Sequence, residues 1–176
     1  MDFTSQNIDS SIPWMTGLQI SNMEEKDIDE VLEIENVSFT SPWTRTSFEH
    51  ELDLKHSKIL IAKKPKGDQK PIVGYISFWL VLDEVHILNL AIHPDFRRQG
   101  IASHLIRFCI QSSRINGANN ASLEVRRSNI PAISLYKKFG FQVKGIRPGY
   151  YSDNHEDAVI MWSKISQNQE YLYHQT

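Results

Sequence analysis

A short basic turn, Arg97-Arg98-Gln99-Gly100-Ile101-Ala102, stands between an expected strand and an expected helix. Backbone N–H groups at the start of a helix have no internal partner, and the helix dipole adds positive potential there. Phosphate is a natural ligand of such a turn, and Gly100 would let it approach the backbone closely. The turn lacks the Gly-Lys-Ser/Thr ending of a P-loop and the three glycines of a dinucleotide fold. A glycine at an ordinary strand-to-helix junction, flanked by solvated arginines, is the alternative interpretation.

Two further side chains have types suited to proton transfer. Glu124 lies on a strand expected over residues 121–126, where it alternates with the apolar side chains of Leu123 and Val125. Tyr136 lies on a helix that begins after Asn129. Taken alone, each residue has a structural interpretation, Glu124 as a solvated strand carboxylate and Tyr136 as a core aromatic.

The turn resembles the Arg/Gln-x-x-Gly-x-Gly/Ala signature of the GCN5-related N-acetyltransferase (GNAT) superfamily, although Ala102 stands where members often carry glycine. The preceding residues 88–94, Leu-Asn-Leu-Ala-Ile-His-Pro, are similar to the fourth strand of that family. The resemblance implies that acetyl-CoA is the cosubstrate. It also implies that the pantetheine arm pairs with the backbone at Leu90, Ala91 and Ile92, and that an N–H near Leu90 polarises the thioester carbonyl. The pyrophosphate would lie among Arg97, Arg98, Gln99, Gly100, Ile101, Ala102 and Ser103.

A closer resemblance, to the ribosomal-protein-alanine N-acetyltransferases (RimI type), covers residues 18–164. It rests on Ser-Pro-Trp at 41–43, Asp-Glu at 83–84, Leu-Glu-Val-Arg at 123–126, Ile-Arg-Pro-Gly-Tyr-Tyr at 146–151 and Glu-Asp-Ala at 156–158. The resemblance implies that Glu124 is the general base, Tyr136 the general acid, and Asn129 a contact of the CoA arm. The residue types suit these roles, because a carboxylate can deprotonate an amine and a phenol of pKa about 10 can protonate a thiolate whose thiol has a pKa of about 8.5.

The acceptor is the most open part of this interpretation. An α-amino group has a pKa of about 8 and a lysine side chain one of about 10.4, so a single carboxylate suits the α-amine better. With the resemblance, this favours the N-terminal alanine of a small-subunit ribosomal protein. Trp43, Tyr150 and Tyr151 are candidate walls around that N-terminus, or ordinary loop packing. A polyamine, a drug or a protein lysine is the alternative acceptor, and a catalytically silent acyl-CoA-binding domain is the alternative of another class.

The elements that must position these residues follow the order β-α-α-β-β-β-α-β-α-β-β, which predicts an α/β GNAT fold with a mixed, mostly antiparallel sheet and helices on both faces. Asp27, Thr44 and Asn129 are expected helix N-caps. We expect a flexible extension over residues 1–16, the acetyltransferase domain over 17–165 and a polar tail over 166–176.

Composition excludes several other classes. The formal net charge is −2, which favours neither nucleic acid nor an anionic membrane as a partner. No signal peptide or membrane span is recognisable, so a cytoplasmic location is expected.

The single cysteine, Cys109, falls on the apolar side of a helix, which favours an inert thiol and direct transfer in a ternary complex. His86, His93 and His104 form no metal-ligand motif; no metal is expected, and these histidines are expected at the surface or in packing.

Overall fold

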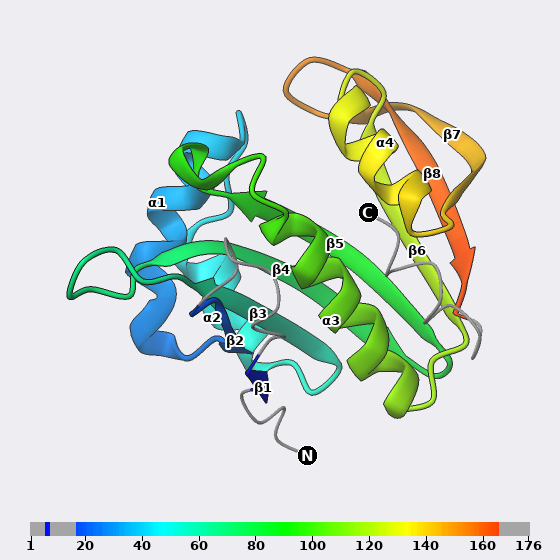
Figure 1. The fold of residues 1–176 in the computed structure, drawn as a ribbon. Coiled ribbons are helices and arrows are strands. Elements are labelled where there is room, and N and C mark those ends of the chain that lie inside the picture. The colour runs from blue at the N-terminus through cyan, green and yellow to red at the C-terminus, as the bar shows by residue number, and fades with distance from the viewer. Residues whose placement is uncertain (1–5, 8–16, 166–176) are drawn as a thin grey trace. The chain divides into compact units, whose positions relative to one another are not determined.

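The helices and strands follow the expected order from β2 onward, which confirms the predicted α/β class (Figure 1). The computed structural model describes residues 6–7 and 17–165; the rest of the expected extension and tail lies outside these residues. The strands are β1 (Gln6–Asn7), β2 (Gln19–Asn22), β3 (Ser57–Lys63), β4 (Ile72–Val81), β5 (Glu84–Ile92), β6 (Asn120–Arg126), β7 (Gln142–Tyr151) and β8 (Glu156–Lys164). The helices are α1 (Ile28–Ser38), α2 (Arg45–Asp53), α3 (Ile101–Ile115) and α4 (Ile130–Lys138), with 3-10 turns η2 (Glu25–Asp27) and η3 (Pro94–Phe96).

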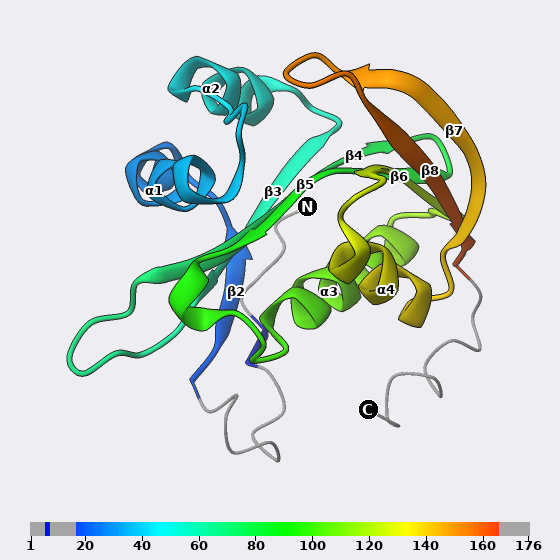
Figure 2. The same cartoon turned by 90° about the horizontal axis from the view of Figure 1, so that it is seen from above.

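The described residues form two units, the first comprising residues 6–7, 17–79 and 88–109 and the second residues 80–87 and 110–165. In the first unit the strand order is β1-β2-β3-β4-β5, and β1 to β4 pair antiparallel. Figure 2 shows α1 and α2 on one face of these strands and α3 on the other, as the sequence predicted. No helix in the described part of the chain is long and apolar enough to cross a membrane.

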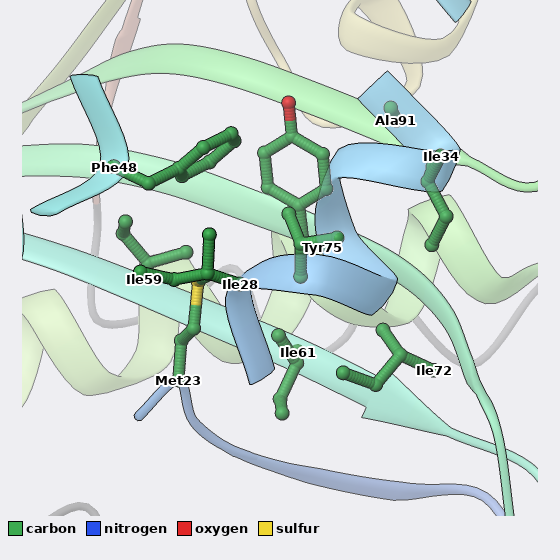
Figure 3. Packing of buried hydrophobic residues seen from close by; sticks show 10 residues of the cluster. Met23, Ile28, Ile34, Phe48, Ile59, Ile61, Ile72, Tyr75 and Ala91 are labelled. Carbon is green, nitrogen blue, oxygen red and sulfur yellow. The ribbon is translucent and has the colours of Figure 1, made fainter. Parts of the chain in front are cut away.

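An apolar cluster under α1 and α2 holds the first unit together. Figure 3 shows Ile28 and Ile34 of α1 and Phe48 of α2 against side chains of β3 and β4. The rings of Phe48 and Tyr75 meet edge to face, with centroids 5.6 Å apart. Burying such aliphatic and aromatic side chains stabilises a fold by roughly 1.5–3 kcal/mol each. This cluster therefore fixes α1 and α2 on the sheet, together with the loop that joins them.

That loop is tied down by one buried carboxylate, Glu35 on α1. Its oxygens accept from the Tyr75 hydroxyl, from the backbone N–H of Trp43 at 2.8 Å and from the Asn89 amide at 3.4 Å. Burial raises the pKa of Glu35, although the hydrogen bonds from Trp43 and Tyr75 oppose the shift. Burial and the adjacent Glu35 charge raise the pKa of Tyr75 as well. Glu35 thus connects α1, β4 and β5 to the backbone of Trp43.

The second unit contains the tip of the β4–β5 hairpin, where Leu82 has φ 55°, and the strand order β5-β6-β8-β7. The ladder between β5 and β6 is parallel and pairs residues 84–87 with 120–123. Strands β6, β8 and β7 pair antiparallel. Helix α4 begins as expected, because the Asn129 side chain accepts from the backbone N–H of Ala132 at 3.2 Å. Pro131 is tolerated in the first turn, where the helix needs no donor.

Asp27 lies at the N-cap position of α1, as predicted, but its side chain makes no capping hydrogen bond to that helix. Its Oδ2 instead accepts from the backbone N–H of Glu24 at 2.9 Å and so caps the preceding 3-10 turn. Strand β7 continues to Tyr151 across Pro148 and Gly149. A shift in the β7–β8 register between Arg147 and Tyr151 accommodates these two residues. Thr44 is the cap of α2, as predicted.

The Glu35 contacts predict a distinct pattern of stability. Glu35→Ala leaves the buried Tyr75 hydroxyl and the Trp43 N–H without their acceptor, and each such loss costs about 1–3 kcal/mol. Glu35→Gln keeps one acceptor oxygen and the side-chain volume, so it should lower the free energy of unfolding much less. Urea denaturation of the three proteins measures the difference. Equal losses in the two variants would show that the hydrogen bonds do not stabilise this loop.

The same variants predict a pH dependence. The folded pKa of Glu35 lies above the ordinary value of 4.5, so its contribution is complete below pH 4.5 and declines as pH rises through the raised pKa. The free energy of unfolding of the wild type should therefore fall relative to that of Glu35→Gln over this interval. A constant difference from pH 4 upward would contradict the assignment.

Candidate active site

The first unit carries the expected cosubstrate-binding residues on the end of β5 and the turn that follows it. Ala91 and Ile92 are buried, and Leu90 is half-buried. The parallel ladder with β6 ends at Ile87, so the backbone of Leu90 to Ile92 lies beyond its pairs. On β4, Gly74 lies close to Ala91 and Ile92; a Cβ on Gly74 would approach the Ala91 carbonyl oxygen to 2.9 Å. A glycine at this position therefore lets β4 and β5 approach closely.

Between β5 and α3 the backbone takes a conformation that few residues adopt. Arg98 has φ 62° and Gly100 has φ 72°, both in the left-handed region. The Gly100 carbonyl accepts the first helical hydrogen bond of α3, from the N–H of His104 at 3.1 Å. The N–H groups of Ile101, Ala102 and Ser103 therefore belong to the first turn, where a helix offers them no carbonyl. This geometry suits an anion such as pyrophosphate.

Arg97 and Gln99 hold the turn in place. The Arg97 guanidinium donates to the Ile92 carbonyl at 2.9 Å and to the Ser38 hydroxyl at 3.2 Å. The Gln99 side chain accepts from Lys64 at 2.5 Å and donates to the Asp95 carbonyl at 3.3 Å. Arg97 thus attaches the turn to β5 and α1. Lys64, which the sequence did not single out, brings a positive charge to the turn from the end of β3.

In the second unit, Glu124 lies between two basic side chains. Its Oε2 is 3.0 Å from His86 Nε2, and its Oε1 is 3.2 Å from Arg147 Nη2. The Glu124 side chain is 11% exposed, so the carboxylate is largely shielded while still reachable from solvent. A carboxylate with basic side chains at 3.0 and 3.2 Å and some exposure to solvent can exchange a proton with its surroundings.

His86 is in turn held by a second set of contacts. Its Nδ1 is 2.7 Å from the Ser122 hydroxyl oxygen, and that hydroxyl donates to a carboxylate oxygen of Glu84. His86 pairs with Ser122 in the parallel ladder, so His86, Ser122 and Glu124 share one face of β5 and β6. Reasoning from sequence assigned His86 to the surface or to packing and missed this contact. The alternation of side chains along each strand indicates which residues share a face. Only the register between the two strands, which the sequence does not give, places His86 beside Glu124.

Tyr136 and Asn129 belong to α4 in the same unit. The Tyr136 side chain is buried, and its ring meets that of Phe141 edge to face with centroids 5.7 Å apart. The Asn129 side chain caps α4, which uses its oxygen within the protein. The structure therefore gives both residues a place in the packing or the capping of α4; their predicted catalytic and CoA-contacting roles stay predictions.

The tyrosines Tyr150 and Tyr151 end β7, and their ring centroids lie 5.2 Å apart. The Arg126 guanidinium stacks 3.9 Å above the Tyr151 ring and binds both oxygens of Asp153. Burial raises the pKa of Tyr151 to about 12, although Arg126 lowers it. Tyr151 is therefore a neutral phenol at physiological pH, fixed in the β7–β8 hairpin.

The loop after α1 holds the third candidate wall residue, Trp43. Its ring meets that of Phe48 edge to face at 5.3 Å, and its backbone N–H is fixed by Glu35. In the described residues, no three histidine, cysteine, aspartate or glutamate side chains gather as a metal site.

Comparison with known proteins gives the class. The model of the Acetyltransferase (GNAT) family matches residues 28–141. The chain therefore belongs to the GNAT family, and its enzymatic class is that of the N-acetyltransferases.

Relatives narrow the similarity further. Over 153 residues the chain is 45% identical to a Bacillus subtilis (strain 168) protein provisionally named ribosomal protein bS18-alanine N-acetyltransferase, covering 86% of this chain and 99% of that protein. It is 32% identical over 149 residues to the ribosomal protein bS18-alanine N-acetyltransferase of Escherichia coli (strain K12), covering 84% of this chain and 97% of that protein. The crystal structure of the ribosomal-protein-S18-alanine N-acetyltransferase from Escherichia coli matches with a TM-score of 0.76 and 32% identity, covering 85% and 95%.

The turn geometry predicts how acetyl-CoA binding responds to substitution. Gly100→Val should abolish the rise in melting temperature that acetyl-CoA produces, because a branched side chain strains φ 72° and blocks the approach to the backbone. Gly67→Val is the matched control, since Gly67 also has a positive φ, of 62°, and open space around its Cβ position. Thermal unfolding with and without acetyl-CoA provides the measurement. A normal shift in Gly100→Val would place the binding site elsewhere.

Proposed function

We propose that this protein transfers the acetyl group of acetyl-CoA to the N-terminal α-amino group of a protein, namely the N-terminal alanine of a small-subunit ribosomal protein. The observation that carries the proposal is the 45% identity over 86% of this chain and 99% of the Bacillus subtilis relative. A similarity over almost the full length of both chains includes the elements that bear Glu124, Tyr136, Trp43 and the turn at Gly100.

The first unit binds the cosubstrate in this proposal. Acetyl-CoA supplies the acetyl group as a thioester. The backbone at Leu90, Ala91 and Ile92 pairs with the pantetheine arm. This pairing is supported by the end of the β5–β6 ladder at Ile87, because the ladder does not use the backbone of these later residues. The pyrophosphate is held by N–H groups from Arg98 to Ser103, with Arg97 and Lys64 adding positive charge. Asn129, which belongs to the second unit, is proposed to contact the CoA arm through its amide N–H₂ group, because its oxygen caps α4.

The second unit carries out proton transfer in this proposal. Glu124 removes a proton from the incoming ammonium or from the amine as it attacks, which leaves the nitrogen lone pair free for the thioester carbon. Tyr136 donates its phenolic proton to the departing thiolate, because a phenol of pKa about 10 is neutral at pH 7. Cys109 takes no part: it is buried in α3, and a buried apolar thiol is a poor nucleophile. Transfer is therefore direct, within a ternary complex.

The kind of acceptor is inferred from how much of each amine is already neutral, and therefore nucleophilic, at neutral pH. At neutral pH roughly a tenth of α-amino groups are already neutral, against fewer than about one lysine in a thousand. Glu124, paired with His86 and Arg147, is a carboxylate suited to the less demanding acceptor. The aromatic residues Trp43, Tyr150 and Tyr151 bind the first residues of the acceptor chain. The reaction takes place in the cytoplasm, where ribosomal proteins are made.

Two other functions make different predictions. An enzyme for a polyamine, a drug or a protein lysine would modify that amine faster than any peptide N-terminus. A silent acyl-CoA-binding domain would bind acetyl-CoA without turnover. The pairing of Glu124 with two basic groups favours an active enzyme, because a binding domain has no need of a carboxylate held in this way.

A peptide panel tests the function. Purified protein is incubated with acetyl-CoA and peptides that begin with Ala-Arg, Ser, Met or acetyl-Ala and share one internal lysine. Tandem mass spectrometry should find the acetyl group on the α-nitrogen of the Ala-Arg peptide, with acetyl-Ala unmodified. Spermidine is included as the small-molecule arm. Acetylation of the lysine in the blocked peptide, or faster turnover of spermidine, would favour the other acceptors; acetyl-CoA binding without any product would indicate a silent domain.

A further inference from the structure

We propose that His86 is a positioning residue that shares with Glu124 the proton taken from the acceptor amine, so that the base is a Glu124–His86 pair rather than a lone carboxylate. The inference rests on the proposed function, since it assigns the partner of the base in that reaction. It concerns residues of the second unit alone, and every contact it uses lies on β5, β6 or β7.

The pair is built into the sheet. His86 and Ser122 occupy opposite positions of the parallel ladder, and Glu124 follows two residues later on the same face of β6. This register brings His86 Nε2 to 3.0 Å from Glu124 Oε2, with the imidazole 29% and the carboxylate 11% exposed. Both side chains rise from hydrogen-bonded strands, so their separation is set by backbone geometry and not by flexible loops.

The contacts behind His86 determine its tautomer. The single hydrogen of the Ser122 hydroxyl is donated to Glu84, so the Ser122 oxygen must accept from His86 Nδ1 at 2.7 Å. Nδ1 is therefore protonated in either charge state. Nε2 consequently faces Glu124 with its lone pair when the imidazole is neutral, and with an N–H when it is charged. When the imidazole is neutral, no hydrogen lies between Nε2 and the carboxylate oxygen 3.0 Å away. His86 and Glu124 together therefore attract one proton.

The proton balance of the reaction follows from this arrangement. The N–H bond of the amine breaks, and the proton forms a bond to an oxygen of Glu124. It then lies between Oε2 and Nε2, either as a carboxylic acid that donates to the imidazole or as an imidazolium that donates to the carboxylate. No electron is transferred to or from the pair, and loss of the proton to water restores both groups. Oε2 and Oε1 each retain a second lone pair toward the acceptor.

Other charges around the pair oppose one another. The Arg147 guanidinium lies 3.2 Å from Oε1 of Glu124, and the Glu84 carboxylate lies beyond Ser122 on the side of His86, so charges of opposite sign flank the pair. On β7 the Tyr151 phenol is neutral, and its pKa is raised chiefly by burial and in part by the Glu124 charge. The β8 residues opposite Ser122 and Glu124 are Trp162 and Ile160, which do not titrate. The alternative to proton sharing is that His86 only holds the Glu124 side chain in place.

Titration of His86 by NMR tests the pair without any substrate. The wild-type protein and Glu124→Gln are compared through the ring signals of His86. Removing the carboxylate at 3.0 Å should change the Nε2 signal of His86, because the shared proton loses its second acceptor, and should leave the Nδ1 proton in place. Equal Nε2 signals in the two proteins would overturn the proposal.

Kinetics with His86→Gln distinguish proton sharing from support. A glutamine amide can donate to Glu124 but cannot take up a proton. We expect kcat to fall about tenfold or more with an unchanged KM for acetyl-CoA, and the acid limb of the pH–rate profile to move to lower pH. His50→Gln, at an exposed position of α2, is the matched control and should match the wild type. A lower rate with the acid limb in its wild-type position would show that His86 is only a support, and an unchanged rate would also overturn the proposal.

The two arms separate the proposals. If the wild type acetylates none of the amines offered, the proposed function fails, while the NMR comparison still decides whether Glu124 and His86 share a proton. If the wild type is active and the Nε2 signals of the two proteins are equal, the proposed function stands and the pair does not.

Discussion

The parallel ladder between β5 and β6 is the constraint on which the candidate site depends. It joins only residues 84–87 to residues 120–123, and its register sets His86 opposite Ser122. Because side chains alternate along a strand, the same register brings Glu124 to His86. The ladder stops at Ile87, so the backbone of the later β5 residues is not used by it. Within the second unit, this short stretch of pairing supports the carboxylate of Glu124.

Two shielded glutamates, Glu35 and Glu124, show how environment divides their tasks. Glu35 is fully buried, receives its hydrogen bonds from uncharged donors, and has a raised pKa because of that burial. It holds the Trp43 backbone, and its hydrogen-bond donors are a backbone N–H, a phenol and an amide. Glu124 keeps some exposure and lies between an imidazole and a guanidinium. Only the second arrangement suits a group that must take up and release a proton in each cycle.

Features set by neighbouring residues could be predicted from sequence, and features set by distant pairing could not. The caps Thr44 and Asn129 were predicted, because a cap is determined by residues three positions apart. The family and the fold followed from the turn at Gly100 and the motifs around Glu124. The contact of His86 with Ser122 joins residues 36 positions apart, and no local pattern specifies the register of their strands. Strand β7 likewise passes through Pro148 and Gly149, residues that are disfavoured inside strands, because a register shift accommodates them.

We propose that Glu124 removes the proton from the acceptor amine, and the pH dependence of kcat tests this role most directly. It is measured for the wild type, Glu124→Gln and Tyr136→Phe on the preferred peptide, with acetyl-CoA binding measured in parallel. We expect Glu124→Gln to lower kcat by about 10²–10⁴-fold at neutral pH with binding intact, and the deficit to narrow as pH rises and more amine is neutral without help. Tyr136→Phe should cost a comparable factor. Near-normal turnover by Glu124→Gln at neutral pH would show that the carboxylate is structural and not the base.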